Sequence, residues 1–234
     1  MIRGLPARAL SAWGRDLASF AFPQLCPGCG ARTTATRLLC DSCFARIPRL
    51  SMALCARCLV RGREPVGCLA HAGQTVWAAW VYDERAALVV QTLKYTERPG
   101  LAHGLGAELA RVAPPAPRPD FVLAVPLHPA RRRERGYNQA GLLADALSDV
   151  LGAPRLEGVL ERVRPTRPQA RLAPRAWREN VADAFLVRRP RWLEGRHVLI
   201  VDDVMTTGAT LEACLDAAAR AGAAACGVVL AWAQ

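Results

Sequence analysis

Residues 198–210 read Val-Leu-Ile-Val-Asp-Asp-Val-Met-Thr-Thr-Gly-Ala-Thr. The apolar beginning, Val198–Val201, is typical of a strand buried on both faces of a parallel sheet. Two acids follow, Asp202 and Asp203, and then a small hydroxyl-rich turn that opens a helix. Ligands of parallel α/β sheets bind at the carboxyl ends of the strands. The stretch therefore predicts a ligand site at the end of this strand.

The turn itself is suited to a phosphate group. Backbone N–H groups at the start of a helix point toward a bound anion, and the helix dipole adds to the attraction. The simpler alternative is a solvated strand end with a helix cap, which explains two adjacent acids poorly. The candidate ligand-binding residues are Asp202, Asp203, Val204, Met205, Thr206, Thr207, Gly208, Ala209 and Thr210.

The rest of the chain from Thr75 alternates between strand and helix patterns, which favours an α/β fold with a parallel sheet. Apolar runs predict the strands, and apolar residues at helical spacing predict the helices. The predicted strands are Val76–Tyr82, Phe121–Val125, Gly158–Val163, Val198–Val201 and Ala225–Trp232; the predicted helices are Glu84–Tyr95, Leu101–Val112, Gln139–Leu151 and one after Thr210.

The cysteines are concentrated in one region. Seven of the nine lie between Cys26 and Cys68, and together with His71 they form four pairs that share a spacing of two intervening residues. This spacing lets a tight turn direct two thiolates to one tetrahedral zinc ion. The gaps inside the two sets are nearly equal, 10 and 9 residues, which predicts a duplicated zinc ribbon with two structural sites: Cys26, Cys29, Cys40 and Cys43, then Cys55, Cys58, Cys68 and His71.

Other interpretations of the cysteine pairs are weaker. A disulfide framework needs an oxidising compartment, and a redox Cys-x-x-Cys motif does not need four successive pairs. Spacing alone leaves open an alternating combination of the pairs. His71 stands where a further cysteine is expected, so the sequence predicts one or two zinc ions.

Composition excludes several classes of protein. Hydrophobic residues make up 52% of the 234 residues, too many for a wholly disordered chain. We expect no membrane span, because no run of about 18 apolar residues occurs. Charged residues interrupt the N-terminal segment, which therefore fits an amphipathic helix over residues 1–22 better than a signal peptide. The expected location is the cytoplasm.

Several motifs occur together in a fixed order along the chain. They are the Cys26-Pro-Gly-Cys29-Gly knuckle, Leu93-Lys94-Tyr95, Arg135-Gly-Tyr-Asn-Gln-Ala140, Arg167-Pro-Gln169 through Asn180 to Phe185, and Asp202–Thr210. This combination resembles the ComF/GntX family, from about Gln24 onward. Its members join a double zinc ribbon to a type I phosphoribosyltransferase-like domain, and they are implicated in DNA uptake or gluconate utilisation.

The resemblance implies a domain order and a ligand. An N-terminal helix (1–22) would precede the double zinc ribbon (23–74) and the phosphoribosyltransferase-like domain (75–234). The ligand would be phosphoribosyl pyrophosphate (PRPP) with Mg²⁺. Asp202 and Asp203 would be the catalytic acids that bind the ribose hydroxyls, and the turn Thr206–Thr210 would hold the 5′-phosphate.

The basic residues are candidates for pyrophosphate binding and for a flexible loop over the site. Arginine suits bidentate phosphate contact, although a run such as 131–135 is commonly only a solvated surface. Lys94 is notable because it is the single lysine of the chain: the other 30 of its 31 Lys and Arg residues are all Arg. The candidates are Lys94, Arg131, Arg132, Arg133, Arg135, Asn138, Gln139, Arg167, Gln169, Arg175 and Asn180.

Two functions from different classes fit these features. The first is transfer of a phosphoribosyl group from PRPP to an unidentified acceptor. The second is a non-catalytic role in which the zinc ribbon and a basic face bind single-stranded DNA, alone or with competence proteins. The net charge of +11 fits either anionic partner.

Overall fold

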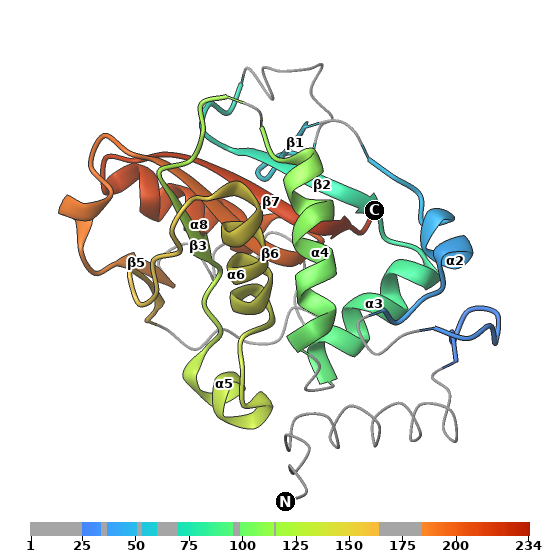
Figure 1. Ribbon diagram of the computed structural model, residues 1–234. Coiled ribbons are helices and arrows are strands. Elements are labelled where there is room, and N and C mark those ends of the chain that lie inside the picture. The colour runs from blue at the N-terminus through green and yellow to red at the C-terminus, as the bar shows by residue number, and fades with distance from the viewer. Residues whose placement is uncertain are drawn as a thin grey trace, which may run out of the picture.

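The apolar run at Val198 forms β6 (His197–Met205), an inner strand of a five-stranded sheet. The computed structural model describes residues 25–33, 37–50, 53–59, 70–95, 99–114, 116–163 and 184–234. The strand order is β1-β2-β7-β6-β3 (Figure 1). Neighbours pair in parallel except at one edge, where β1 is antiparallel to β2. The other strands are β1 (Ala53–Cys55), β2 (Thr75–Val81), β3 (Phe121–Ala124) and β7 (Ala224–Trp232).

Each face of the sheet has its own apolar core, because successive side chains of a strand point to opposite faces. On one face, Leu199 and Val201 of β6 belong to the same cluster as Leu143 of α6. On the other face, Ile200 belongs to the cluster of Leu211. The first face is covered by α3 (Glu84–Tyr95), α4 (Pro99–Val112) and α6 (Gln139–Leu151), and the second by α8 (Ala209–Arg220).

A second, two-stranded sheet lies beside α8. It pairs β4 (Leu160–Arg162) with β5 (Phe185–Val187) in antiparallel fashion. The strand predicted over 158–163 is thus present but shorter, and it belongs to this separate sheet. Residues 164–183 between the two strands lie outside the described residues.

The structure confirms the predicted α/β class, and several helices have the expected bounds. One prediction was wrong: Asp202 and Asp203 do not follow the strand but lie inside β6. Pairing with β7 continues past both acids, as far as Met205 opposite Trp232. The helix predicted over residues 1–22 lies outside the described residues.

The sequence analysis missed several short elements. The helix α5 (Pro129–Arg135) occupies a segment expected to be a loop, although its ends carry helix signals. The His128 side chain caps its start, Pro129 stands at the first turn, and Gly136 ends it in the left-handed conformation. Also missed were α2 (Asp41–Ala45), β1, β5 and the short helix η2 (Pro190–Trp192). Within the described ranges, no helix combines the length and the hydrophobicity that a membrane span requires.

Candidate functional site

The predicted phosphate turn lies where β6 ends and α8 begins. Thr206 is exposed and Thr207 is partly exposed, while Gly208 is buried. Gly208 has a φ of 76° and stands at the N-cap of α8, a left-handed conformation that favours glycine. No side chain caps this helix end. The first amides of α8 therefore lie beside two threonine side chains, an arrangement that suits an anion.

The two acids of β6 have different neighbours. The Asp202 carboxylate accepts a hydrogen bond from the Asp203 amide at 2.9 Å, and Asp203 accepts one from the Val204 amide at 2.8 Å. Burial raises the pKa of the Asp202 carboxyl well above its usual range, and the neighbouring Asp203 charge raises it further. The Asp203 side chain is 6% exposed, and Lys94 Nζ lies 3.0 Å from its Oδ2 atom.

Lys94 is held in place by contacts of the residues on both sides of it. The Tyr137 hydroxyl donates a hydrogen bond to the Leu93 carbonyl at 2.7 Å. The Arg135 guanidinium stands 5.5 Å from the centre of the Tyr95 ring. The end of α3 is thereby joined to the segment between α5 and α6, and the only lysine of the chain reaches the acids of β6.

The candidates around α5 fall into two groups. Arg131, Arg132 and Arg133 are exposed. Asn138 and Gln139 have structural contacts instead. The Asn138 amide donates to the Val125 carbonyl at 3.0 Å, and its oxygen accepts from the Ala140 amide at 3.2 Å. Gln139 is buried and accepts a hydrogen bond from Arg135.

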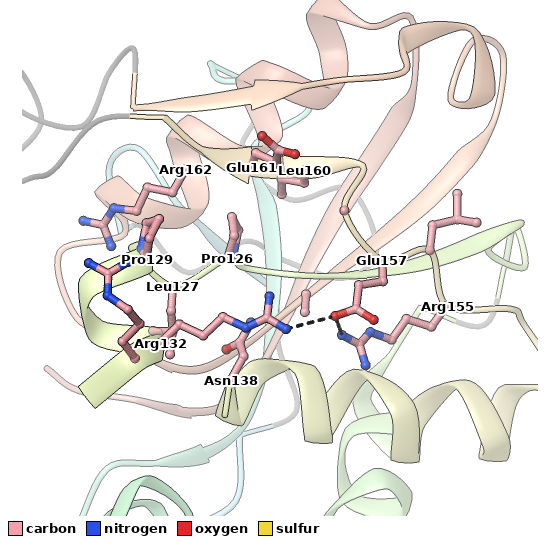
Figure 2. Close-up of a pocket in the computed structure, with 14 residues that line it drawn as sticks. Pro126, Leu127, Pro129, Arg132, Asn138, Arg155, Glu157, Leu160, Glu161 and Arg162 are labelled. Carbon is pink, nitrogen blue, oxygen red and sulfur yellow. Dashed lines mark hydrogen bonds and ion pairs between the residues drawn. The ribbon is translucent and has the colours of Figure 1, made fainter. Parts of the chain in front are cut away.

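A pocket of about 500 Å³ opens at the carboxyl end of β3 (Figure 2). Glu157 bridges two of its arginines, 3.5 Å from Arg132 and 3.8 Å from Arg155. The sequence analysis missed Arg155 and Glu157, because they belong to no motif and reach the pocket only through the path of the chain after α6. The basic lining residues are Arg132, Arg133, Arg155 and Arg162.

The pocket and the acids of β6 are neighbours. None of residues 202–210 lines the pocket, but Ala124 of β3, which does line it, pairs with Val201, the residue before Asp202 on β6. Burial lowers the pKa of Arg162. Arg162 ends β4, at the start of the segment that holds four of the loop candidates. These four, Arg167, Gln169, Arg175 and Asn180, lie outside the described residues.

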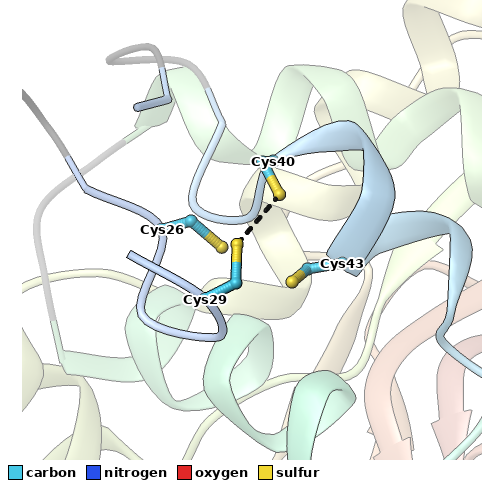
Figure 3. A group of neighbouring side chains, drawn as sticks. All are labelled: Cys26, Cys29, Cys40 and Cys43. Carbon is cyan, nitrogen blue, oxygen red and sulfur yellow. Dashed lines mark hydrogen bonds between the residues drawn. The ribbon is translucent and has the colours of Figure 1, made fainter. Parts of the chain in front are cut away.

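The first cysteine group has the geometry of a zinc site (Figure 3). Its four sulfur atoms lie within 4.8 Å of one another, and those of Cys29 and Cys40 are 3.5 Å apart. Sulfurs of a tetrahedral zinc site lie about 2.3 Å from the metal and hence about 3.8 Å apart. Burial acts to raise the pKa of Cys26, but backbone amides outweigh it and lower the value to about 6.

The second group brings Cys55, Cys58 and His71 together, also within 4.8 Å. Cys68, the predicted fourth ligand, lies outside the described residues. Burial raises the pKa of Cys55 to about 11. The two groups follow the predicted order of the pairs, first with second and third with fourth, and not the alternating combination.

Comparison with known proteins agrees with both the cysteine groups and the α/β sheet described above. Residues 17–70 match the double zinc ribbon domain, and residues 138–234 match the phosphoribosyl transferase domain. The DNA utilization protein YhgH of Salmonella typhi is 32% identical over 222 residues, which cover 92% of this chain and 88% of that protein. Competence protein F of Haemophilus influenzae is 32% identical over 190 residues, covering 74% and 81% of the two chains. The chain belongs to the ComF family.

The solved structures include a more distant likeness. Adenine phosphoribosyltransferase from Leishmania tarentolae aligns over 68% of this ComF-family chain and 82% of its own, with a TM-score of 0.37 and 15% identity.

The resemblance to the ComF family stated from the motifs is thus confirmed, as is the double zinc ribbon. The ribbon match and the cysteine groups indicate zinc as the metal. In this ComF-family chain the structure brings Lys94, Asp202 and Asp203 to one end of the sheet, with the exposed arginines of α5 and the basic pocket on neighbouring segments.

Proposed function

We propose that the protein binds PRPP at the carboxyl ends of β3 and β6 and transfers its phosphoribosyl group to an acceptor. The observation that carries this proposal is the acidic strand end that runs directly into an uncapped helix start, with Lys94 3.0 Å from Asp203. Ribose hydroxyls and a 5′-phosphate need these two kinds of partner side by side.

The proposed roles follow from chemistry and position. Asp202 and Asp203 accept hydrogen bonds from the ribose hydroxyls, and the turn Thr206–Thr210 holds the 5′-phosphate. Lys94 and the arginines of α5 face the pyrophosphate, together with the loop candidates Arg167, Gln169, Arg175 and Asn180. Arginine and lysine are the side chains that proteins use for such groups.

The reaction would be a displacement at the anomeric carbon. The bond from this carbon to the pyrophosphate oxygen breaks, and a bond to the nucleophile of the acceptor forms. Positive charge develops on the ribose ring and negative charge on the departing pyrophosphate. The carboxylates of β6 would stabilise the first and the basic side chains the second, so positioning and electrostatics supply most of the acceleration.

Mg²⁺ fits the donor set at this strand end, since it prefers hard oxygen ligands such as carboxylates and phosphates. Asp202 and Asp203 would hold it together with the oxygens of PRPP. When bound, the ion would neutralise part of the charge of the pyrophosphate.

Calorimetry with PRPP and Mg²⁺ tests the proposal. The parent protein should bind PRPP, and the double variant Asp202→Asn with Asp203→Asn should not, while zinc content and circular dichroism stay unchanged. Equal affinity in the double variant would refute this ribose site. Pyrophosphate release with a panel of nucleobase and amine acceptors then tests for turnover.

A second candidate function is binding of single-stranded DNA, and the observation that favours it is an exposed tryptophan among arginines. Trp192 on η2 is 46% exposed, and the Arg189 guanidinium lies 4.4 Å from the centre of its ring. Arg188 and Arg191 are exposed nearby. A base stacked on an aromatic ring contributes about 1–3 kcal/mol, and basic side chains follow the phosphates.

The test of this second function uses Trp192→Ala. We expect affinity for an oligothymidine to fall at least about fivefold, as loss of one stacked base worth about 1 kcal/mol or more requires. PRPP affinity should not change, because Trp192 lies outside the residues proposed for PRPP. Unchanged DNA affinity would exclude this surface. We further propose a cytoplasmic location, where thiolates stay reduced and can bind zinc. The names of the relatives suggest partners in DNA utilization or competence.

A further inference from the structure

The second zinc site packs directly on the turn proposed to hold the 5′-phosphate. Ala56 and Arg57 stand between the ligands Cys55 and Cys58, and both Cys55 and Ala56 are fully buried. A methyl group built on Gly208 would lie 2.0 Å from the Ala56 carbonyl oxygen. The glycine of the turn therefore lies backbone to backbone against the knuckle, with no room for any side chain.

Ion pairs fasten the same knuckle to the helix that the turn opens. Arg57 Nε donates to Glu212 at 2.6 Å, and another nitrogen of its guanidinium lies 3.3 Å from Asp216. Glu212 stands on the first turn of α8, where its own amide donates to the Gly208 carbonyl at 2.8 Å. Arg57 thus contacts the first turn of α8, the part of the helix whose amides are proposed to hold the 5′-phosphate.

The other half of the zinc site reaches α8 as well. Gln74, which is buried, donates from its side chain to Asp216 at 2.7 Å. Its backbone amide donates to the His71 carbonyl at 3.3 Å, and its carbonyl accepts from the Ala56 amide at 2.8 Å. Arg57, beside Cys58, and Gln74, near His71, therefore both contact α8.

We propose that Arg57 is a positioning residue and that zinc at the second site is coupled to binding of a phosphorylated ligand at the 206–210 turn. The metal fixes the backbone of the knuckle, the knuckle fixes Gly208 and the first turn of α8, and each ligand thereby strengthens binding of the other. Such coupling is reciprocal and typically changes affinity by 5- to 150-fold. The inference rests on the proposed PRPP site.

The first experiment compares Arg57→Ala with Arg49→Ala. Arg49 forms an ion pair of similar exposure with Glu108 on α4, which covers the opposite face of the sheet from α8, so it is a matched control. In Arg57→Ala we expect amide hydrogen exchange of residues 212–215, the first amides bonded within α8, to rise about tenfold and PRPP affinity to fall about tenfold, within the usual range of coupling. Arg57→Lys should restore part of the protection from exchange and part of the PRPP affinity. Arg49→Ala should change neither the exchange nor the affinity. Equal behaviour of the two alanine variants would overturn the proposal.

The second experiment tests the reverse direction on the parent protein. Zinc is withdrawn with a coloured chelator, with and without saturating PRPP and Mg²⁺. PRPP should slow release of one of the two ions at least about fivefold and leave the other unchanged. Equal release rates with and without PRPP would contradict the coupling.

The two proposals fail in distinguishable ways. If the parent binds no PRPP, the proposed function is wrong, and hydrogen exchange still decides the structural part of the inference. In that case, zinc removal must raise exchange at residues 212–215 of α8 more than at residues 143–147 of α6. If Arg57→Ala does not fold, this comparison on the parent protein replaces it.

Discussion

At the scale of single residues, Lys94 carries the clearest expectation. Its ammonium group lies 3.0 Å from Asp203 Oδ2, and its side chain is 26% exposed. Arginine keeps the charge but is planar and longer, so it would engage Asp203 with its own fork and lose the lysine's position. We predict that Lys94→Arg lowers PRPP affinity about tenfold, about 1.4 kcal/mol, by calorimetry.

The control for Lys94 lies on the same helix. Arg85 lies in the first turn of α3, at the opposite end from Lys94, and stands 3.6 Å from Asp83. Arg85→Lys should leave PRPP affinity unchanged. If both variants bind PRPP as the parent does, Lys94 has no special role in binding, and its being the single lysine among so many arginines is a coincidence.

Asp202 gives a prediction about stability and pH. Burial raises its pKa in the folded protein, so folding is penalised when the group must ionise. This penalty is absent below the pKa of the unfolded chain, about 3.9, grows as pH rises from there toward the raised folded pKa, and is constant above it. We predict that Asp202→Asn raises the melting temperature at pH 7 by about 2–4 °C, the shift expected for about 1 kcal/mol.

The gain should shrink as pH falls toward 4, which scanning calorimetry at several pH values would measure. Asp149→Asn on the exposed side of α6 is the control, with no such pH-dependent gain. A loss of stability in Asp202→Asn that is equal at all pH values would contradict the argument.

At the scale of elements, the Tyr137 hydroxyl joins α3 to the segment before α6. It donates to the Leu93 carbonyl at 2.7 Å, one residue from Lys94. A typical hydrogen bond contributes about 1 kcal/mol, so Tyr137→Phe should lower the melting temperature by about 2–4 °C. PRPP affinity should fall with it, because the end of α3 loses a support. Tyr95→Phe, at a residue that is 71% exposed, should change neither the melting temperature nor the PRPP affinity.

Elements with strong local signals were predicted well from the sequence. The helix Gln139–Leu151 has the predicted bounds, because Asn138 caps its start and Gly152 ends it in the left-handed conformation. The strands β1 and β5 were missed because three-residue strands depend on a distant partner. The structure places β1 on β2 across the expected domain boundary at residue 75.

The candidate site likewise combines residues with a local sequence signal and contacts that depend on distant parts of the chain. The acids and the phosphate turn form one continuous motif, so the sequence alone singled them out. The contact of Lys94 with Asp203, and of Arg57 with Glu212, joins residues far apart in the chain and needs the folded sheet. No sequence periodicity predicts that a zinc knuckle lies against the turn.

At the scale of the whole molecule, the zinc ribbon is part of the main fold and not an appendage. Ala53 and Cys43 belong to the same buried cluster as Trp80 and Leu143. Phe44 packs edge-on against Trp80, with ring centres 5.6 Å apart. Loss of zinc should therefore weaken the sheet as well as the ribbon, unlike the removal of metal from an independent zinc finger.

Metal content tests this view of the molecule. We predict about two zinc ions per chain by elemental analysis of protein purified without chelator, because two groups of ligands are brought together. Cys40→Ser and Cys58→Ser should each retain about one ion, and each should unfold at a lower temperature than the parent. Cys226→Ser, outside both groups, should retain both ions. A parent value near one would remove the second site and with it the coupling to α8, whereas a value near zero would refute the ribbon.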